Sequence, residues 1–502
     1  MKVFLTLPEI SSRELGENLG IAYIEAAIKA SSLSKVLLVN RMGKKNTADI
    51  LSVLEQYDPD VVGIGLPSYT LLPSLSELAG RIGQGRPRTI IVGGHSVAFR
   101  AEAIMNEVPA LDLAILGEGE RTIIEVLQAL LSRSAMLDVP GLLIRSTSGL
   151  AYTLRREKIA DLDSLPLPTR QPGLPYYLIS ASRGCYANCA FCSIPPFNRL
   201  QPGLALRLRS IASLRLEMIE LKRLGARVVS FIDDVFLLPG EKGLARARAI
   251  ADIMSECSIK WAFACRTTAL NESVLSYCVA RGLCNVGLGI ESASPNVLAR
   301  LAKGATLEDS ERAILLCQAH GLSIQPYFIM FEPDMTFDDL RMNMEFLQRF
   351  GLLWPVCSKM ILNPLPGTPV FDTLSAQGRL KEANHSFSAV YRDPRVQEFR
   401  DVVRPVLEGA SGFEFAIRRA EFDLAVISQD DAYIARRAPI ETLVHRLSDY
   451  TYQFLERALT GDYSSGLYHR QIDELAGELE SGFGFIRRQL THSCERIAES
   501  PI

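Results

Sequence analysis

The chain has 502 residues, of which 48% are hydrophobic and 22% are charged, a balance typical of globular proteins and not of fibrous or disordered ones. This length predicts two or three domains. The formal net charge of −3 gives no basic surplus for binding phosphate backbones, so no nucleic acid partner is expected. The N-terminal apolar run is too short for a signal peptide, and no stretch approaches 18 apolar residues. We therefore expect a cytoplasmic protein without a membrane span.

Short β-type runs alternate with amphipathic helical runs over residues 1–135. The expected strands are 2–7, 35–39, 61–66, 89–92 and 113–116, and the helical runs include 21–30 and 122–131. This alternation predicts an α/β domain of the doubly wound, Rossmann-like type with a parallel sheet. Ligands of such sheets bind at the carboxyl ends of the strands. Near those ends this chain carries Ser68, Gly93-Gly94-His95 and Gly117-Glu118-Gly119.

The rest of the chain divides into three parts. Residues 136–176 predict a linker with a small hairpin, because turn residues separate two strand-like runs. Residues 177–374 predict a partial (β/α)6 barrel, with strands at 177–182, 228–232, 261–265, 285–289, 324–330 and 359–362. Strand signals vanish beyond about residue 375. Residues 375–502 are therefore expected to form a mostly helical substrate or cap domain, with helices that include 440–459 and 471–489.

Three of the ten cysteines, Cys185, Cys189 and Cys192, lie close together after the first strand of the second alternation. Three thiolates can hold three irons of a 4Fe-4S cluster, and the fourth iron is then open to chelate a small molecule. A structural zinc site normally uses four ligands in two pairs, and the sequence has no second Cys-x-x-Cys or His pair. The spacing therefore favours a cluster over zinc. Most of the other cysteines are expected in the core.

The segment from Ser182 to Cys192 resembles the signature of the radical S-adenosylmethionine (SAM) superfamily, Cys-x-x-x-Cys-x-aromatic-Cys, with Phe191 in the aromatic place. The resemblance implies that the cluster donates one electron to SAM. This releases methionine and a 5'-deoxyadenosyl radical, which abstracts a hydrogen atom. The resemblance also implies a small-molecule substrate and an electron donor such as flavodoxin or ferredoxin.

The same resemblance extends along about 200 residues and implies further contacts with SAM. The expected contacts are Phe191, Asp233, Arg266, Glu291 and Ser292. Asp233 follows the second strand of the barrel, and its alternative role is that of a helix cap. Arg266 ends the third strand and could pair with the methionyl carboxylate, or it could be a surface arginine. Residues 331–336 depart from the family's Gly-x-Pro-Gly-Glu-Thr loop, which leaves the substrate contacts there open.

The N-terminal domain resembles the cobalamin-binding domain of the cobalamin-dependent radical SAM subclass, through the segments 60–65, 92–95 and 117–120. The resemblance implies cobalamin contacts at Ser68, Gly93, Gly94, His95, Gly117, Glu118 and Gly119. The Asp-x-His-x-x-Gly motif of other cobalamin domains is absent, because residues 8–13 read Pro-Glu-Ile-Ser-Ser-Arg. No histidine is therefore expected on the lower cobalt face, and His95 is expected near the nucleotide tail.

Three functions are compatible with the sequence. The leading hypothesis is a cobalamin-dependent radical SAM methyltransferase that methylates an unactivated carbon, because a corrin without a strong lower ligand favours methyl transfer to a carbon radical. The alternative keeps both cofactors but catalyses a non-methylating rearrangement, cyclisation or oxidation. The third hypothesis is a non-catalytic sensor of cobalamin or of the cluster, disfavoured by the lack of a basic stripe or DNA-reading helix.

Overall fold

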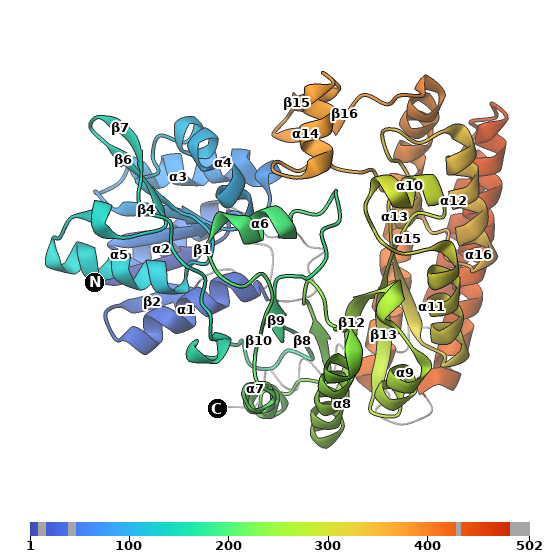
Figure 1. Cartoon of the computed structure of the whole chain (residues 1–502), viewed down its shortest axis with the longest axis horizontal. Helices are drawn as coiled ribbons and strands as arrows, with labels where there is room; N and C mark the ends of the chain where they lie inside the picture. Colours follow the sequence, from blue (N-terminus) through green and yellow to red (C-terminus); the bar gives the residue numbers. More distant parts are fainter. Residues whose placement is uncertain (9–16, 39–46, 428–432, 482–502) are drawn as a thin grey trace.

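The computed structural model describes residues 1–8, 17–38, 47–427 and 433–481. The expected loop at 9–13, Cys494 and the last part of the expected helix at 471–489 lie outside the described residues. Two α/β units lie side by side, and the helices of the C-terminal part pack on the far side of the second unit (Figure 1). In the described part of the chain, no helix is both long enough and apolar enough to span a bilayer.

A seven-stranded sheet in the order β2-β1-β3-β4-β5-β6-β7 forms the first unit. The strands β1 to β5 run parallel, whereas β6 and β7 are antiparallel. The strands are β1 (Lys2–Thr6), β2 (Lys35–Leu38), β3 (Val61–Gly65), β4 (Thr89–Gly93), β5 (Leu113–Ile115), β6 (Leu142–Ser146) and β7 (Gly149–Tyr152). The helices are α1 (Leu19–Ser31), α2 (Thr47–Tyr57), α3 (Leu72–Gly83), α4 (His95–Glu107) and α5 (Glu120–Ser132).

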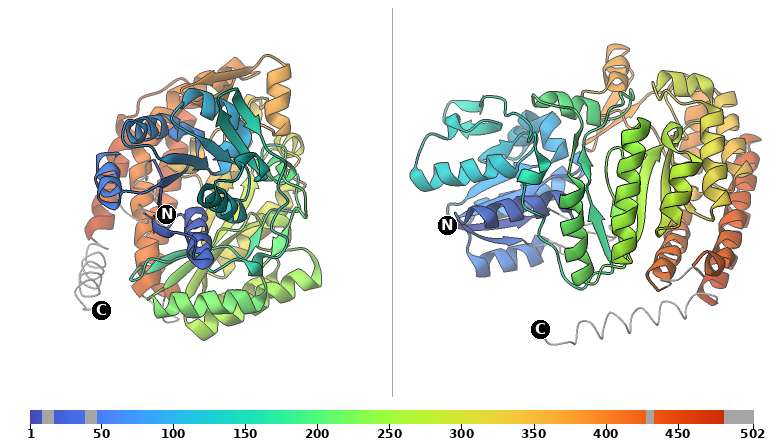
Figure 2. Two further views of the ribbon diagram at one scale, coloured as in Figure 1. Left: turned by 90° about the vertical axis from the view of Figure 1, so that its left-hand side faces the viewer. Right: turned by 60° about the horizontal axis from the view of Figure 1, so that its bottom comes forward.

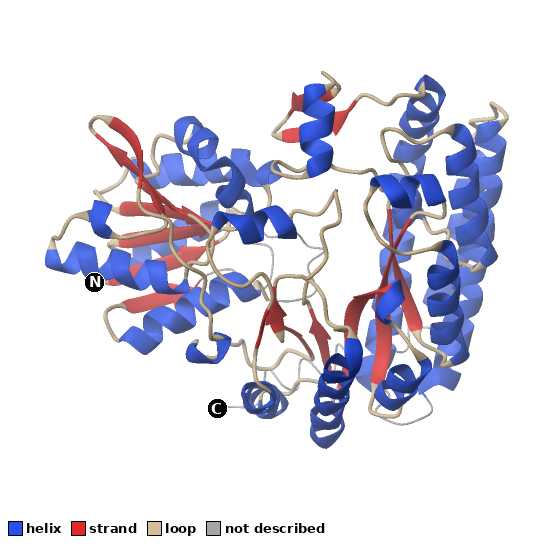
Figure 3. Cartoon of the chain, in the orientation of Figure 1, coloured by secondary structure: helices blue, strands red, loops and turns tan. Residues whose placement is uncertain are grey.

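Alternate side chains of these strands point to opposite faces, and helices cover both faces (Figure 3). Val3 and Leu5 of β1 pack in one core with Val126 of α5, whereas Phe4 packs in a second core with Leu75 of α3. The expected doubly wound fold is confirmed. The hairpin expected within 136–176 is β6–β7, and it extends this sheet beyond β5.

A five-stranded parallel sheet in the order β14-β13-β12-β11-β8 forms the second unit. Its strands are β8 (Tyr176–Ile179), β11 (Val228–Phe231), β12 (Lys260–Arg266), β13 (Leu283–Glu291) and β14 (Ser323–Phe328). The sixth expected strand, at 359–362, is reduced to one parallel bridge between Phe331 and Ile361. Pro364 and Pro366 follow directly, and because proline lacks a backbone donor the pairing does not extend there.

Helices and a small ribbon surround this open barrel. The ribbon pairs β9 (Ser182–Arg183) with β10 (Arg207–Leu208), and α6 (Ile194–Leu200) lies between its strands in the chain. The helices that follow are α7 (Ile211–Arg223), α8 (Gly240–Cys257), α9 (Glu272–Val279), α10 (Pro295–Arg300), α11 (Leu307–Ala319), α12 (Phe337–Arg349), α13 (Pro355–Ser358) and α14 (Pro369–Ala376). Four short 3-10 helices also occur among the described residues of the chain: η1 (Tyr69–Leu71), η2 (Met136–Asp138), η3 (Leu162–Ser164) and η4 (Thr267–Ala269).

The C-terminal part is mostly helical, as expected. It consists of α15 (Pro394–Ile427), α16 (Tyr433–Leu459) and a helical segment at 466–481, and α15 packs on α12, α13 and α16. The expectation that no strands follow residue 375 is wrong, because β15 (Leu380–Ala383) pairs with β16 (Ser386–Ala389). Asn384 and His385 both have positive φ and form a two-residue turn, which sequence propensity did not reveal because the strands lack β-branched residues.

Buried ion pairs join the two units. In the α7 network, Arg170 of the connecting segment contacts Glu17 (3.2 Å) and Glu217 of α7, and Glu217 also pairs with Arg209. In the ribbon network, Arg183 and Arg207 of the ribbon pair with Glu118 and Glu120 of the N-terminal unit. The pairs between units therefore fix the orientation of the first sheet relative to the barrel.

Removal of the Glu217 charge tests the α7 network. Because Glu217→Gln leaves two buried arginines without their shared carboxylate, we expect the free energy of unfolding to fall by about 3–5 kcal/mol, the usual cost of breaking a buried ion pair. The measurement is the midpoint of thermal unfolding of the full-length protein. Glu220→Gln is the matched control, because Glu220 lies on the same helix and pairs with Arg223 in solvent. Equal midpoints for the two variants would contradict a structural role for the network.

Candidate active site

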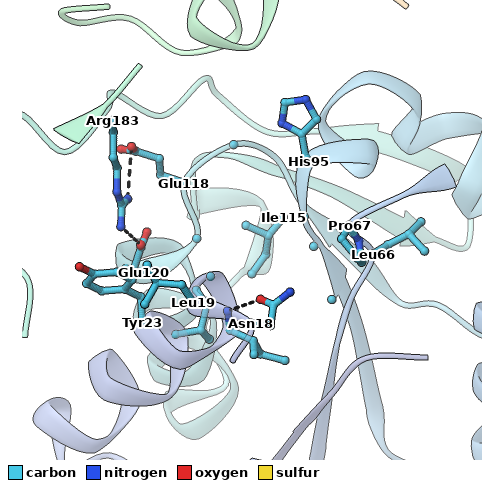
Figure 4. A pocket seen from close by; sticks show the side chains of 18 of the residues that line it. Asn18, Leu19, Tyr23, Leu66, Pro67, His95, Ile115, Glu118, Glu120 and Arg183 are labelled. Carbon is cyan, nitrogen blue, oxygen red and sulfur yellow. Dashed lines mark hydrogen bonds and ion pairs between the residues drawn. The ribbon is translucent and has the colours of Figure 1, made fainter. Parts of the chain in front are cut away.

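The carboxyl ends of the strands in both units face one another across a cavity of about 510 Å³, here called the interdomain cavity. Its lining from the first unit includes Gly65, Leu66 and Gly93 at the ends of β3 and β4, and Gly117 after β5. The opposite lining comes from the second unit and includes Ser182, Arg183 and Gly184, with Asn198 of α6. Figure 2 shows the two units around this region, and Figure 4 shows the cavity from close by.

A second cavity of about 590 Å³, the barrel cavity, lies along the inner face of the five-stranded sheet. Barrel interiors are normally filled by large branched side chains. Here Ala264 of β12 pairs with Gly287 of β13, and the next inward position of β13 is Gly289, so the space stays open. Ile232 and Asp234, which follow β11, line both cavities. Ligands in the two cavities would therefore be neighbours.

The cysteine loop begins directly after β9. Cys185, Cys189 and Cys192 are all free thiols, and Arg266 donates a hydrogen bond from Nη1 to Sγ of Cys189 (3.2 Å). The backbone N–H of Gly184 donates to Asp234 (3.0 Å) and ties the loop to the end of β11. Gly184 has φ +89°, and a Cβ there would collide with the backbone of Ala205, so this approach requires glycine.

The chemistry of this donor set fits an iron-sulfur cluster. Burial and the neighbouring thiols raise the pKa of Cys192 to about 11, so iron must displace protons when it binds. The guanidinium of Arg266 donates a hydrogen bond to Sγ of Cys189, so its positive charge would lie beside a cluster held by this loop. Three thiols on one loop would bind three irons of a cluster. Arg266, which donates a hydrogen bond to this loop, also lines the barrel cavity, so the loop lies beside that cavity.

Three of the five expected SAM contacts line the barrel cavity, namely Asp233, Arg266 and Glu291. Glu291 has φ +67°, follows a register shift between β13 and β14, and pairs with Lys303 (2.7 Å). Strained non-glycine residues of this kind occur at functional sites because the surrounding structure holds them in place. Lys303 also lines the cavity and was not expected from the sequence, since it lies in a loop without a motif.

The adjacent carboxylates Asp233 and Asp234 have different surroundings. Asp233 accepts hydrogen bonds from the Ala181 N–H (3.1 Å) and the Ser182 hydroxyl, and burial raises its pKa to about 6. Asp234 lines both cavities. Asp234 is therefore the better placed of the two for a ligand, although Asp233 was the residue expected from the sequence.

Two expected SAM contacts lie outside both cavities. The hydroxyl of Ser292 is fully buried and shares a hydrogen bond with Asn343 of α12 (2.9 Å). Phe191 is partly buried and packs against the core of the second unit. Their positions lend no support to a direct contact with a ligand in either cavity.

Six of the seven expected cobalamin contacts line the interdomain cavity: Gly93, Gly94, His95, Gly117, Glu118 and Gly119. Ser68 does not, because its hydroxyl caps η1 by accepting from the Thr70 N–H. His95 bonds through Nε2 to Ser193 (2.9 Å) and stacks on Phe197 of α6, and burial lowers its pKa. His95 thus links the end of β4 to the segment after Cys192.

The carboxylate of Glu118 is already engaged. Arg207 (2.8 Å) and Arg183 (3.3 Å) contact it, and the Ile159 N–H donates to it (2.9 Å). Burial alone would raise the pKa of Glu118, but these donors and charges outweigh burial and hold its pKa below the ordinary value. Glu118 therefore stabilises the interface between the units, and Figure 4 shows the contact with Arg183.

The cavity wall fits a large cofactor rich in hydrogen-bond acceptors. The glycines after β4 and β5 line this wall and are closely packed by the chain itself, because a Cβ on Gly94 would meet the backbone of Leu66 and one on Gly117 would meet the side chain of Gln201. On the opposite wall, Nδ2 of Asn198 and Nε of Arg207 are buried without a hydrogen-bond partner in the described structure. Buried donors without partners are rare in proteins, so a bound ligand is their natural complement. Sequence patterns did not reveal these donors, because they come from the second unit.

Comparison with known proteins agrees with this geometry. A model of the radical SAM superfamily matches residues 179–347, and a model of the B12 binding domain matches residues 10–127. An uncharacterized methyltransferase of Pyrococcus horikoshii is 27% identical, with 76% of this chain and 85% of that protein covered. The 4'-phospho-dehydrooxetanocin synthase of Priestia megaterium is 25% identical, with 67% of this chain and 49% of that protein covered.

A solved structure shares the fold over almost the whole chain. The structure of OxsB, a cobalamin-dependent SAM radical enzyme with aqua-cobalamin and SAM bound, superimposes with a TM-score of 0.72 at 18% identity and covers 98% of this chain and 81% of that one. The barrel and its cysteine loop thus define a radical SAM enzyme. With the B12 binding domain in the same chain, the protein belongs to the cobalamin-dependent radical SAM enzymes, whose cofactors are a 4Fe-4S cluster, SAM and cobalamin.

Replacement of Asn198 by leucine tests the fit to cobalamin. Because the amide Nδ2 has no partner in the described structure, Asn198→Leu should leave the stability of the cofactor-free protein unchanged or slightly higher. The same change should weaken cobalamin binding about tenfold through loss of one hydrogen bond to the cofactor. Absorbance titration with hydroxocobalamin measures the affinity, and thermal unfolding measures the stability.

Arg199→Gln is the matched control, because Arg199 is the next residue of α6 and is exposed. It should bind cobalamin like the unchanged protein. A normal affinity in Asn198→Leu would remove this amide from the cofactor site.

Proposed function

We propose that this protein is a methyltransferase that uses SAM, a 4Fe-4S cluster and cobalamin to methylate an unactivated carbon of a small molecule. The observation that carries the proposal is the common wall of Ile232 and Asp234, which makes the interdomain cavity and the barrel cavity neighbours. Methyl transfer to a substrate radical requires that the methyl donor and the source of the radical lie on two sides of one substrate. The name of the Pyrococcus horikoshii relative supports this reaction.

When bound, the cofactors would supply the difficult chemistry, namely the one-electron cleavage of SAM into methionine and a 5'-deoxyadenosyl radical, and the carriage of a methyl group. The residues of this chain would hold the cofactors, orient them and shield the space between them from water. Cys185, Cys189 and Cys192 would hold the cluster, with Arg266 hydrogen-bonded to Cys189. Asp234 and the Glu291–Lys303 pair would orient the ligand of the barrel cavity. Apolar side chains such as Ile232 keep water from the space between the ligands.

We propose the following division of the chain for this function. Residues 1–135 bind cobalamin, 136–176 connect the units, 177–374 hold the cluster and SAM, and 375–502 complete the substrate site. Gly93, Gly94, His95, Gly117 and Gly119 would contact cobalamin. The electron would come from a small redox protein such as flavodoxin or ferredoxin.

Loss of one loop cysteine should abolish the cluster. In Cys189→Ala only two thiols remain, so we expect no cluster absorbance after anaerobic reconstitution and no cleavage of SAM. Cys317→Ala is the matched control, because Cys317 is a buried core residue of α11 far from the loop in sequence. The control should keep a full cluster and cleave SAM. Retained cleavage in Cys189→Ala would refute the assignment of the cluster ligands.

A labelled methyl group tests the reaction type without knowledge of the substrate. The reconstituted protein receives reduced cobalamin, a reductant and SAM deuterated in its methyl group. We expect mass spectrometry to find the label on cobalamin, together with 5'-deoxyadenosine. If 5'-deoxyadenosine forms while bound cobalamin stays unlabelled, methyl transfer is refuted. A non-methylating reaction would then be favoured, which the synthase of Priestia megaterium also suggests by its name.

A further inference from the structure

The far part of the barrel cavity has a chemistry that the cofactors do not explain. Helix α15 contributes Arg418 and Glu421 to the cavity lining. The inward side chains of β14 add Ser323, Gln325 and Tyr327. These residues come from the last strand of the sheet and from the C-terminal part, whereas the cysteine loop follows the first strand. They therefore form a distinct polar end of the cavity.

Arg418 is fixed in one orientation. Its Nε and Nη2 both donate to Oε1 of Glu414 (3.2 and 3.3 Å), and its guanidinium lies over the ring of Trp354, 4.4 Å from the centroid. Glu414 is in turn held by the Val356 N–H (2.7 Å). Nη1 of Arg418 makes no hydrogen bond within the described residues. A guanidinium that is already positioned loses little entropy when its remaining amino group binds a ligand.

Tyr327 lies beside this arginine. Its ring lies against β13 at Gly287, where a Cβ would stand 2.7 Å from Cε2 of the ring. The side chain is 48% exposed, and it faces the cavity that it lines. Burial raises the pKa of Tyr327, the charge of Arg418 opposes this rise, and that of Glu291 adds to it. The charges of Arg418 and Glu291 both act on Tyr327, and its hydroxyl makes no hydrogen bond in the part of the chain described.

Three donor groups thus face one end of the cavity: the Arg418 guanidinium, the Tyr327 hydroxyl and the Gln325 amide. The amide of Gln325 makes only a 3.5 Å contact with the carbonyl of Pro326. Of the carboxylates near them, Glu291 is paired with Lys303, Glu414 holds Arg418, and Glu421 accepts from the Ser323 hydroxyl (3.0 Å). A ligand group with several acceptor oxygens and a negative charge would satisfy all three donors.

We propose that the substrate carries a carboxylate or phosphate group that binds Arg418, Tyr327 and Gln325 at this end of the barrel cavity. The anion would then anchor the substrate, and the rest of the molecule would extend toward Glu291, Asp234 and the cysteine loop. The identification of this ligand as the substrate rests on the proposed function. The site favours a substrate with an anionic group over a purely hydrocarbon one, because only the anionic group would take up the open hydrogen bonds of these donors.

Anion binding by the loaded enzyme tests the proposal without turnover. The reconstituted protein is saturated with hydroxocobalamin and SAM in the absence of a reductant, so that both cofactor sites are filled and SAM is not cleaved. Inorganic phosphate in one series and acetate in another are then added in increasing concentration. The midpoint of thermal unfolding measures binding, since a ligand of the folded state raises the midpoint. The anion that raises the midpoint of thermal unfolding shows whether the site binds phosphate or carboxylate groups.

We expect Arg418→Gln to weaken the binding of the effective anion at least tenfold and Tyr327→Phe to weaken it a few-fold, while Arg418→Lys retains part of it. The matched control is Arg404→Gln, because Arg404 lies on the same helix and pairs with Glu408 in solvent. It should bind like the unchanged protein. If Arg418→Gln fails to fold, the anion affinity of Tyr327→Phe tests the proposal, because this variant removes only one hydroxyl group.

Two results would overturn the proposal: no binding of either anion by the unchanged protein, or equal binding by Arg418→Gln, Tyr327→Phe and the control. The proposed function is judged separately. The deuterated methyl assay needs no anion and no substrate, and the anion titration needs no reaction. Failure of methyl transfer alone would therefore leave the anion site standing, and failure of anion binding alone would leave the methyltransferase standing.

Discussion

The placement of the two units depends on buried charges between them. Arg170 of the connecting segment pairs with Glu17 of the first unit and with Glu217 of α7, and Arg183 and Arg207 pair with Glu118 and Glu120. Such pairs contribute little net stability, because desolvation of the ions offsets much of their attraction. Their geometry, however, is strict, and a displaced unit would leave several charges buried without partners. The networks therefore specify one relative orientation, in which the carboxyl ends of both sheets border the same space.

This orientation explains why the two cavities meet. A doubly wound sheet and a barrel each bind ligands at the carboxyl ends of their strands. In this chain the two edges are turned toward each other, and the residues after β11 belong to both sites. Small residues on β12 and β13 then extend the second site into the barrel, where α15 contributes part of the lining. The shape of the reaction space thus results from three separate features: charge pairing, strand polarity and the absence of large inward side chains.

Much of the fold and the cluster loop could be predicted from the sequence, because periodicity and cysteine spacing are local signals. Other features depend on backbone geometry that the sequence does not display. Asp233 and Asp234 are adjacent carboxylates after a strand, and only the turn decides which of them lines both cavities. Ser292 follows Glu291, whose positive φ redirects the chain toward α12. Asn198 and Arg418 could not be found at all, since the cavities that they line are built from several elements and no motif marks them.

The wall of the interdomain cavity is shared between two units that are synthesised in sequence. The sheet of the first unit is complete once Tyr152 has been added, whereas Asn198 and Arg207 follow about 50 residues later, and β14 only after residue 323. Domains tend to fold as they emerge from the ribosome, with the N-terminal one first. The newly formed sheet must therefore expose its glycine-rich edge until the ribbon and α6 arrive, and enclosure of cobalamin is a late event in the maturation of the chain.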